Sequence, residues 1–411
     1  MELTRTKFKQ TEIGLIPEDW EVLKLKETLA ENPKYGIGAA ATDFNLNLPT
    51  YLRITDIEED GTLRKNDLKS VDHQDSGNYF LKNGDIVFAR TGASVGKSYL
   101  YDTKDGFLVY AGFLIKVSPN NSILNSQFLK AFVSTKTYWN WVTVMSMRSG
   151  QPGINSIEFG SLQIPLPPLS EQKAIAQVLS DTDNLIHAIE QKLTKKRAIK
   201  QGAMQQLLTP KENWEVKKLP EVCWFQEGPG LRNWQFTEKG MKVINVTNLV
   251  NGYLNLDKTD RHISMNEFEK MYKHFEIDEN DIVMASSGNS YSKVAGVRKQ
   301  DLRLLMNTSV IRFKPLDGLD YNYLLIFLKS KIFKDQIDLL ITGGAQPNFG
   351  PFHLKKIDIA IPSTMEEQIH ISTILSDMEI EIEQIEEQLS KYKLLKQGLM
   401  QNLLTGKIRL V

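Results

Sequence analysis

The sequence contains a single cysteine, Cys223, among 411 residues. One thiol can form neither an internal disulfide nor a cysteine-based zinc site, so Cys223 is interpreted as a small buried side chain. The six histidines are scattered, with no HExxH pattern that would indicate a metal site. No apolar run approaches the ~20 residues that cross a bilayer, and charged residues precede any apolar run at the N-terminus. We therefore expect a soluble, cytoplasmic protein with no signal peptide, no metal and no membrane partner.

The chain also has no excess of charge of either sign, because 50 lysines and arginines balance 50 aspartates and glutamates. This balance excludes a protein that acts as one large cationic surface. It leaves nucleic-acid binding open, since that depends on the local distribution of charge. Hydrophobic residues make up 41% of the chain, an ordinary globular share, and the length corresponds to about two or three domains.

The most informative feature of the sequence is an internal repeat. Residues 171–209 match residues 367–405 at 19 of 39 positions, with an offset of 196. Both copies end in Lys-Gln-Gly-x-Met-Gln-x-Leu-Leu-Thr. The regions before them correspond faintly, in short strand-like runs such as Asp-Ile-Val at 85–87 and 281–283. The chain is therefore a duplication in which each variable domain is followed by a repeated segment.

Both repeated segments are predicted to be long helices. In the second copy, seam positions recur at alternating spacings of four and three from Ile371 to Leu403, which is typical of a coiled coil. The first copy has a good seam from Ile175 to Leu193 and a more polar one afterwards. At about 1.5 Å per residue, such a helix is about 58 Å long. Gly202 and Gly398 interrupt strong helix formers, which indicates either close approach by another helix or simple inheritance from the duplicated ancestor.

The charge pattern predicts how the two helices pair. The first helix is basic late, over residues 192–200, whereas the second is acidic over 366–387 and basic over 391–396. Antiparallel packing places basic against acidic segments, whereas parallel in-register packing would oppose lysines. We expect an antiparallel pair. The alternative is that these charges only solvate exposed helix faces.

Together these patterns predict an α+β fold. Two mixed α/β domains are joined by two long helices that form an antiparallel coiled coil, with a pseudo-two-fold internal duplication. The expected boundaries are 1–168 for the first variable domain, 169–209 for the central helix, 210–363 for the second variable domain and 364–411 for the C-terminal helix. Each variable domain should contain a curved sheet and short helices, such as those at 126–133 and 321–328. Two similar domains at a fixed separation would suit two patches on a long pseudo-symmetric ligand such as duplex DNA.

An enzyme is the second hypothesis, and it rests on one segment. Residues 92–98, Gly-Ala-Ser-Val-Gly-Lys-Ser, look like a phosphate-binding loop but have three residues between the glycines instead of four. The second copy, which begins at Gly288, has lost the second glycine. No methyltransferase motif, AdoMet loop or convincing nuclease cluster is visible. A coiled-coil scaffold that binds only protein is the third hypothesis.

The same loops are better interpreted as DNA contacts, because they combine glycine with hydroxyl, amide and cationic side chains after a strand. The first copy offers Arg90, Thr91, Ser94, Lys97 and Ser98, and the second offers Ser286, Ser287, Asn289, Ser290, Tyr291 and Lys293. A further cluster before each repeated segment comprises Arg148, Gln151 and Asn155, matched by Gln346 and Asn348, and a third comprises Arg232 and Asn233. For any one of these residues the alternative is a solvated loop side chain.

The whole chain resembles the specificity subunit of type I restriction–modification enzymes. The resemblance rests on the openings Gly14-Leu15-Ile16-Pro17-x-x-Trp20 and Asn213-Trp214-Glu215-Val216, on the linker Ile164-Pro165-Leu166-Pro167-Pro168-Leu169-x-Glu171-Gln172, on the strand and turn of residues 84–92, and on the paired helix endings. The second linker, residues 361–368, departs from the pattern because it lacks the double proline and has one extra residue.

This resemblance implies two target-recognition domains, each of which reads one half of a bipartite sequence in double-stranded DNA. It also implies that the helices set the spacing and dock two methyltransferase subunits, which are joined by restriction and translocase subunits. AdoMet, ATP and magnesium would then belong to those partners, and this chain would have no cofactor and no catalytic activity of its own.

Overall fold

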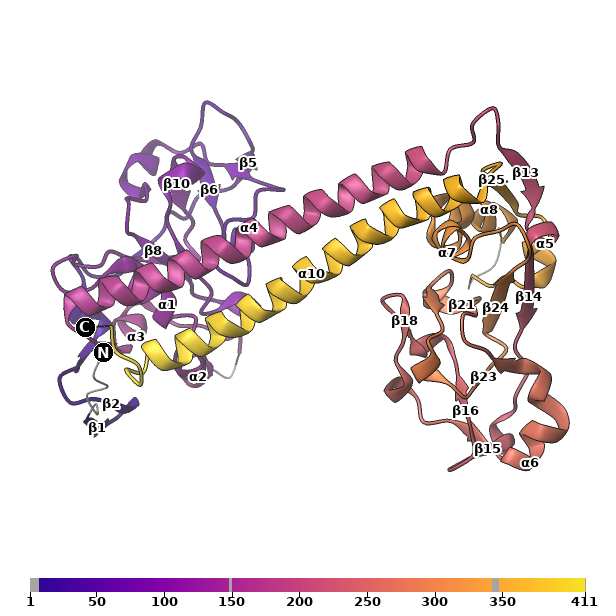
Figure 1. The fold of residues 1–411 in the computed structure, drawn as a ribbon. Helices are drawn as coiled ribbons and strands as arrows, with labels where there is room; N and C mark the ends of the chain where they lie inside the picture. Colours follow the sequence, from indigo (N-terminus) through magenta and orange to yellow (C-terminus); the bar gives the residue numbers. More distant parts are fainter. Residues whose placement is uncertain (1–6, 148–149, 342–346, 411) are drawn as a thin grey trace. The chain divides into compact units, whose positions relative to one another are not determined.

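The computed structural model describes residues 7–147, 150–341 and 347–410. The chain divides into two compact units, Met1–Glu190 with Glu387–Val411, and Gln191–Glu386 (Figure 1). Each unit contains one variable domain together with part of each long helix. Within the part of the chain that the structure describes, no helix is both long and apolar enough to cross a membrane, and no cluster of three metal-ligating side chains is found.

The first unit is built on two four-stranded sheets, of order β4-β11-β8-β9 and β10-β6-β7-β5, with β10 parallel to β6. Strands β1 and β2 form one antiparallel pair, and β3 and β12 form another. The strands are β1 (Phe8–Thr11), β2 (Gly14–Pro17), β3 (Glu21–Lys24), β4 (Lys34–Tyr35), β5 (Thr42–Asp43), β6 (Thr50–Leu52), β7 (Lys69–Ser70), β8 (Ile86–Ala89), β9 (Ser98–Leu100), β10 (Leu108–Tyr110), β11 (Leu114–Val117) and β12 (Gln163–Leu166).

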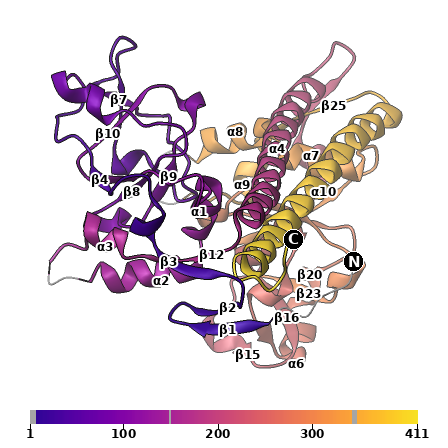
Figure 2. The same cartoon turned by 90° about the vertical axis from the view of Figure 1, so that its left-hand side faces the viewer.

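Strand β8 is buried on both faces, which explains why its sequence is a continuous apolar run. Ile86 and Phe88 contribute to the core formed with helices α1 (Ser126–Phe132), α2 (Lys136–Met145) and α3 (Ser156–Gly160). Val87 and Ala89 point the other way, into the core shared with the second sheet. Figure 2 shows β4, β8 and β9 in one sheet.

The second unit repeats this plan. Its sheets have the orders β14-β24-β21-β22 and β15-β19-β16-β23-β20, with β16 parallel to β23, and β13 pairs with β25 as β3 pairs with β12. The strands are β13 (Glu215–Lys218), β14 (Cys223–Glu227), β15 (Phe236–Thr237), β16 (Met241–Ile244), β17 (Leu249–Val250), β18 (Tyr253–Leu254), β19 (His262–Ile263), β20 (Glu276–Ile277), β21 (Ile282–Ala285), β22 (Val294–Gly296), β23 (Leu304–Met306), β24 (Val310–Pro315) and β25 (Asp358–Ile361). The helices are α5 (Leu219–Val222), α6 (Met265–Glu267), α7 (Tyr321–Lys329), α8 (Lys331–Leu340) and α9 (Pro351–Leu354).

The two repeated segments are the long helices α4 (Leu169–Leu207) and α10 (Met365–Leu403), which lie side by side in both views (Figure 1, Figure 2). Half of their predicted seam residues are buried, among them Ile175 and Leu193 in α4 and Ile371 and Ile385 in α10, and the others are half-buried. Helices α1 and α7 lie where short helices were expected, and the fold class is confirmed.

Ion pairs within each unit show that the two helices run antiparallel. In the second unit, Lys196 Nζ lies 2.7 Å from Glu381 Oε2. In the first unit, Lys396 Nζ lies 2.5 Å from Asp183 Oδ1. Basic ends therefore face acidic segments, as the charge pattern predicted.

A buried glutamine anchors each long helix to the domain before it. Gln172 accepts a hydrogen bond from the Asn125 amide (2.9 Å) and donates to the carbonyl oxygens of Ile123 and Pro167. Gln368 accepts from the Asp320 amide (2.8 Å) and donates to the carbonyl oxygens of Gly318 and Pro362. These bonds satisfy backbone groups that the helix starts would otherwise bury unpaired. The glutamine of the repeated Glu-Gln dipeptide thus has the same structural role in both units.

Candidate DNA interface

In the first unit, the predicted DNA-contacting loop is a tight turn between two paired strands. After β8 comes a single helical turn, Gly92–Ser94, and then β9 begins at Ser98. The Gly92 amide donates to the Pro152 carbonyl (3.0 Å), which fixes the turn against the segment before α3. A nucleotide-binding P-loop places its lysine at the start of a helix, where several amides converge on phosphate. Because a strand follows here instead, the turn cannot form that cradle.

The second unit keeps this turn although its sequence differs. The turn Gly288–Ser290 joins β21 to β22, and the Gly288 amide donates to the Pro347 carbonyl (3.0 Å), as Gly92 does to Pro152. Ser292 occupies the position of Gly96 and adopts the same left-handed backbone, with φ of 61° against 88°. The loss of the second glycine therefore leaves the turn intact. What the two copies share is the loop geometry.

Several predicted residues of the first unit converge at this turn. Arg90 is half-buried, with its guanidinium carbon 4.9 Å from the centre of the Tyr35 ring and its Nε without a hydrogen-bond partner. Thr91 forms a backbone bridge with Gly153, and Gln151 is exposed close to Gly92. These residues form a polar surface at one end of the β4-β11-β8-β9 sheet.

Other predicted residues of the first unit have internal partners. Lys97 Nζ lies 2.6 Å from Glu59 Oε1, and Ser98 is buried. Asn155 caps helix α3 by accepting hydrogen bonds from the amides of Ile157 and Glu158. Its side chain is therefore committed to the helix start. Ser94 is half-buried in the turn itself, and Arg148 lies outside the described residues.

In the second unit, too, some predicted residues of the turn are exposed and others are buried or bonded within the fold. Ser286 is buried and its Oγ has no hydrogen-bond partner, whereas Lys293 and Asn348 are exposed and Ser287 and Ser290 are half-buried. The Tyr291 hydroxyl donates to Asp338 (2.5 Å) and accepts from Lys334 (2.6 Å), so it holds the turn to α8. The Asn289 side chain and Gln346 lie outside the described residues.

The clusters before the two repeated segments can be aligned residue by residue at the turn. Asn348 bridges Ser287 as Gly153 bridges Thr91. Asn348 therefore takes the place of Gly153, because both residues sit one position after the proline whose carbonyl accepts from the turn. An amide side chain thus stands in the second unit where the first has none.

Arg232 and Asn233 are exposed but belong to another layer of the second unit. Their segment contacts the core beneath the five-stranded sheet through Leu231, and its next residue, Trp234, is 80% exposed. Gln235 fixes the segment by donating to the Tyr272 hydroxyl (3.0 Å). This second exposed surface is separate from the turn at Ser287.

Two residues beside the turns were missed by the sequence analysis. Tyr35 ends β4 and contacts Arg90, the residue that follows β8. Glu227 ends β14, which takes the place of β4 in the sheet of the second unit. Burial raises the pKa of the Glu227 carboxyl. Burial also acts to raise the pKa of Tyr35, but hydrogen bonds from Ser156 and the charge of Arg90 outweigh it and lower that pKa. A Gly-x-Gly sequence follows both residues and was the available signal.

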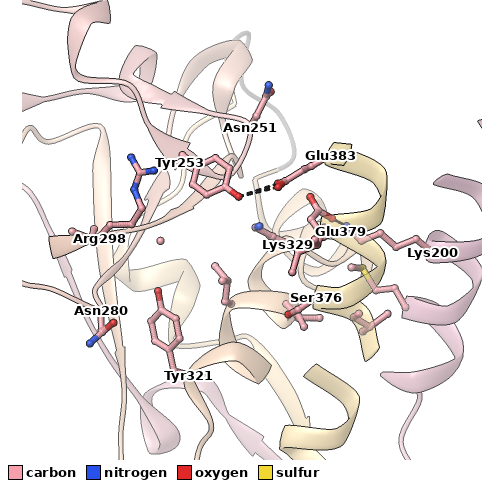
Figure 3. A pocket seen from close by; sticks show the side chains of 18 of the residues that line it. Lys200, Asn251, Tyr253, Asn280, Arg298, Tyr321, Lys329, Ser376, Glu379 and Glu383 are labelled. Carbon is pink, nitrogen blue, oxygen red and sulfur yellow. Dashed lines mark hydrogen bonds and ion pairs between the residues drawn. The ribbon is translucent and has the colours of Figure 1, made fainter. Parts of the chain in front are cut away.

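The second unit also contains a cavity of about 430 Å³ between the β17–β18 hairpin, α7 and the long helices (Figure 3). The Tyr253 hydroxyl donates to Glu383 (3.1 Å) across it, and Lys200 forms an ion pair with Glu379 at its helical wall. None of the predicted DNA-contacting residues lines it. The cavity belongs to the junction between domain and helices.

Comparison with known proteins gives a consistent result. The family model described as "Type I restriction modification DNA specificity domain" matches residues 17–197 and again 211–391. The chain is 28% identical over 427 residues to the type I restriction enzyme MjaVIII specificity subunit of Methanocaldococcus jannaschii, covering 98% of this chain and 96% of that protein. It is also 28% identical over 429 residues to the putative MjaX specificity subunit of the same organism, with the same coverage.

Solved structures support the fold. A type I restriction–modification S subunit from M. genitalium superposes with a TM-score of 0.62 at 15% identity, covering 98% of each chain. A chain from a study of complex assembly and conformational transition in a type I system superposes with a TM-score of 0.58 at 15% identity, covering 96% of this chain and 99% of that one.

Proposed function

This chain belongs to the family of type I restriction–modification DNA specificity subunits, and from this premise we propose that each of its two variable domains reads one half of a bipartite target in double-stranded DNA. The observation that carries the proposal is the matched turn, in which a retained backbone presents different side chains in the two units. A protein that reads two unlike half-sites needs such a pair of similar frames with unlike surfaces. Within this proposal, the residues at the turns that remain open to DNA are Arg90, Thr91, Gln151, Ser287, Lys293 and Asn348.

We propose that the helical pair sets the half-site spacing and docks two methyltransferase subunits, through which restriction and translocase subunits join. Large apolar side chains on the helices are exposed, including Ile199, Ile380 and Leu394. In addition, a side chain added at Gly202 or Gly398 would meet open space within this chain. No contact among the described residues therefore requires these glycines, and close approach by a partner helix supplies a reason for them.

We propose that the chain contributes recognition and not chemistry. AdoMet, ATP and magnesium then serve the partner subunits, and the assembly works on DNA in the cytoplasm. The strand that follows Gly92–Ser94 argues against the one nucleotide-binding segment that the sequence suggested. ATP hydrolysis by the purified chain that is lost in Lys97→Ala would contradict this proposal.

The decisive experiment is to express the chain with its neighbouring methyltransferase in a methylation-free host and map modified bases by sequencing. Omitting the chain is the control. The proposal expects a split motif with a fixed gap, methylated only when the chain is present. Methylation without the chain, or a continuous motif, would contradict it.

A further inference from the structure

The first unit holds Tyr35 and Arg90 together through a specific backbone frame. Tyr35 lies opposite Ile115 of β11, and the next residue, Gly36, donates its amide to the Leu114 carbonyl (3.1 Å). A side chain at Gly36 would run into the carbonyl oxygens of the turn between β10 and β11. Arg90 donates its amide to the Phe113 carbonyl in that same turn (3.1 Å). Both side chains are therefore placed by the backbone.

The second unit reproduces both of these backbone bonds. Glu227 lies opposite Ile311 of β24, and the Gly228 amide donates to the Val310 carbonyl (3.0 Å). A side chain at Gly228 would run into the carbonyl oxygen of Asn307 in the turn between β23 and β24. Ser286 donates its amide to the Ser309 carbonyl (2.9 Å), as Arg90 does to Phe113. Glu227 thus stands in the place of Tyr35, and Ser286 in the place of Arg90.

At these equivalent positions the two units present opposite chemistry. In the first, the Arg90 guanidinium lies over the Tyr35 ring and has no carboxylate partner among the described residues. In the second, the Glu227 carboxylate is half-buried and makes no hydrogen bond or ion pair within the described part of the chain, and the Oγ of Ser286 is likewise unpaired. Arg90 Nε and Ser286 Oγ are buried atoms without a hydrogen-bond partner among the described residues, and such atoms are costly unless a ligand pairs with them. The half-buried Glu227 carboxylate remains open to a ligand.

A DNA phosphate does not suit both sites. A half-buried carboxylate would be repelled by phosphate, so at a DNA surface it is favourable only when it accepts a hydrogen bond from an amino group of a base. Cytosine N4 and adenine N6 are the amino groups exposed in the major groove, and the guanine edge offers the two acceptors that match a guanidinium. A stacked, planar Arg90 is suited to that paired contact.

We propose that Arg90, backed by Tyr35, reads a guanine in one half-site, and that Glu227, in the equivalent frame of the second unit, reads an exocyclic amino group of cytosine or adenine in the other. This inference rests on the proposed function and assigns to each domain one specificity-determining side chain of opposite charge. A base without the matching group would leave the protein group desolvated and unpaired, which is how a buried polar group discriminates strongly.

The test compares Arg90→Gln and Glu227→Gln in the assembled complex with the methyltransferase, by mapping modified bases across a methylation-free genome. Lys26→Gln and Glu212→Gln are matched controls, because both side chains are exposed and lie outside the two frames. Arg90→Gln should reduce the preference for guanine at one position by about ten- to a hundredfold and leave the other half unchanged. Glu227→Gln should relax or change one position in the other half, and the wild-type base there tells cytosine from adenine.

Three results would overturn the inference. They are an unchanged motif in both variants, changes in the same half-site, and an Arg90→Gln variant that still methylates the unchanged motif but to a uniformly lower extent at all sites, which would mark a phosphate contact. If a glutamine variant methylates nothing, Arg90→Lys and Glu227→Asp decide by the same criteria. Lysine keeps the positive charge but cannot make the paired contact of arginine, and aspartate keeps the negative charge on a shorter side chain. A wild-type complex without a bipartite motif would instead refute the proposed function.

Discussion

The last residues of the chain provide the sharpest test of how the first unit is held together. Arg409 forms paired hydrogen bonds with Glu171 at the start of α4 (2.6 and 2.7 Å) and with Asp19 (2.9 and 2.7 Å). Glu171 also accepts a hydrogen bond from the Trp20 indole (3.1 Å). The guanidinium is thus the only cation joined to Glu171 among the described residues, and it comes from beyond the end of α10.

The duplication supplies a natural control in the second unit. There Lys211 follows α4 and lies 2.7 Å from Glu367, which accepts a hydrogen bond from the Trp214 indole (3.3 Å). Glu367 and Trp214 are the repeats of Glu171 and Trp20. The two sites share their plan but differ in burial and in pairing, since Arg409 bonds two carboxylates and Lys211 bonds one. The buried, more fully paired site should therefore contribute more.

Burial sets the expected magnitudes. The Glu171 side chain is 1% exposed and Arg409 is 15% exposed, whereas Lys211 and Glu367 are 56% and 24% exposed. Removing one partner of a buried pair costs about 3–5 kcal/mol, and since Glu171 keeps the Trp20 donor we expect about 2–4 kcal/mol for Arg409→Met. An exposed pair contributes only about 0.2–1 kcal/mol, which is the loss expected for Lys211→Met.

Hydrogen exchange followed by mass spectrometry can resolve the two sites in the intact chain. Peptides that contain Trp20 should lose about 2–4 kcal/mol of opening free energy in Arg409→Met, while those that contain Trp214 should not change. Methionine keeps most of the apolar stem, so the loss reports the charge. The double variant Arg409→Met with Glu171→Gln should recover part of the loss, because the buried carboxylate is removed too.

A result in which Lys211→Met costs as much as Arg409→Met would refute the reasoning, since burial would then not set the magnitude. A double variant that is no more stable than Arg409→Met alone would also refute it, because the loss of stability would then not come from the unpaired charge of Glu171. Circular dichroism of each variant checks that the long helices remain formed.

Three further predictions concern the junctions and the helix pair. Gly61→Ala should lower the urea midpoint of the first unit by more than Gly106→Ala does. The two glycines have similar φ angles, +75° and +78°, but only at Gly61 would the new Cβ approach a carbonyl oxygen, at 2.5 Å. Burial lowers the pKa of Lys130 from 10.5 to about 8. Between pH 8 and 10.5 the unfolded chain therefore binds more protons than the folded one, so the free energy of unfolding should rise with pH in this range. Urea titrations at pH 7.5 and 10 should show this rise in the wild type and not in Lys130→Met. Lys396→Glu should lower the urea midpoint at low salt and Asp183→Lys added to it should restore the midpoint, because the pair is reversed; no restoration would contradict the pairing.

The helical pair was predictable because its signals are local in sequence. The heptad spacing identified seam residues such as Ile189 and Ile382, and the charge runs set the orientation later seen in the Lys196–Glu381 contact. Each signal repeats over many residues, so no single exception misleads. Long-range strand pairing was needed for neither inference.

The recognition surfaces were only partly predictable, because they are assembled from distant segments. Tyr35 reaches Arg90 through the pairing of β4 with β11, which no periodicity in two-residue strands reveals. Asn155 looked like a base-reading amide, yet its position before a helix makes it a cap. Similarly, Tyr291 looked free in a polar loop, but its hydroxyl lies between Lys334 and Asp338. Residue type alone does not distinguish a side chain used for folding from one left for a ligand.

The paired frames explain how one half-site preference can diverge from the other without cost to the fold. The bonds that fix each turn are made by backbone groups, which must be satisfied in both units whatever side chains they carry. Gly36 and Gly228 are constrained because any side chain would run into a neighbouring carbonyl oxygen. Of the residues just before them, Tyr35 also holds the start of α3, because its hydroxyl accepts a hydrogen bond from the Ser156 amide (3.1 Å). The Glu227 carboxylate makes no hydrogen bond or ion pair among the described residues. A substitution at either glycine should therefore cost stability, whereas one at Glu227 should change the base that is preferred.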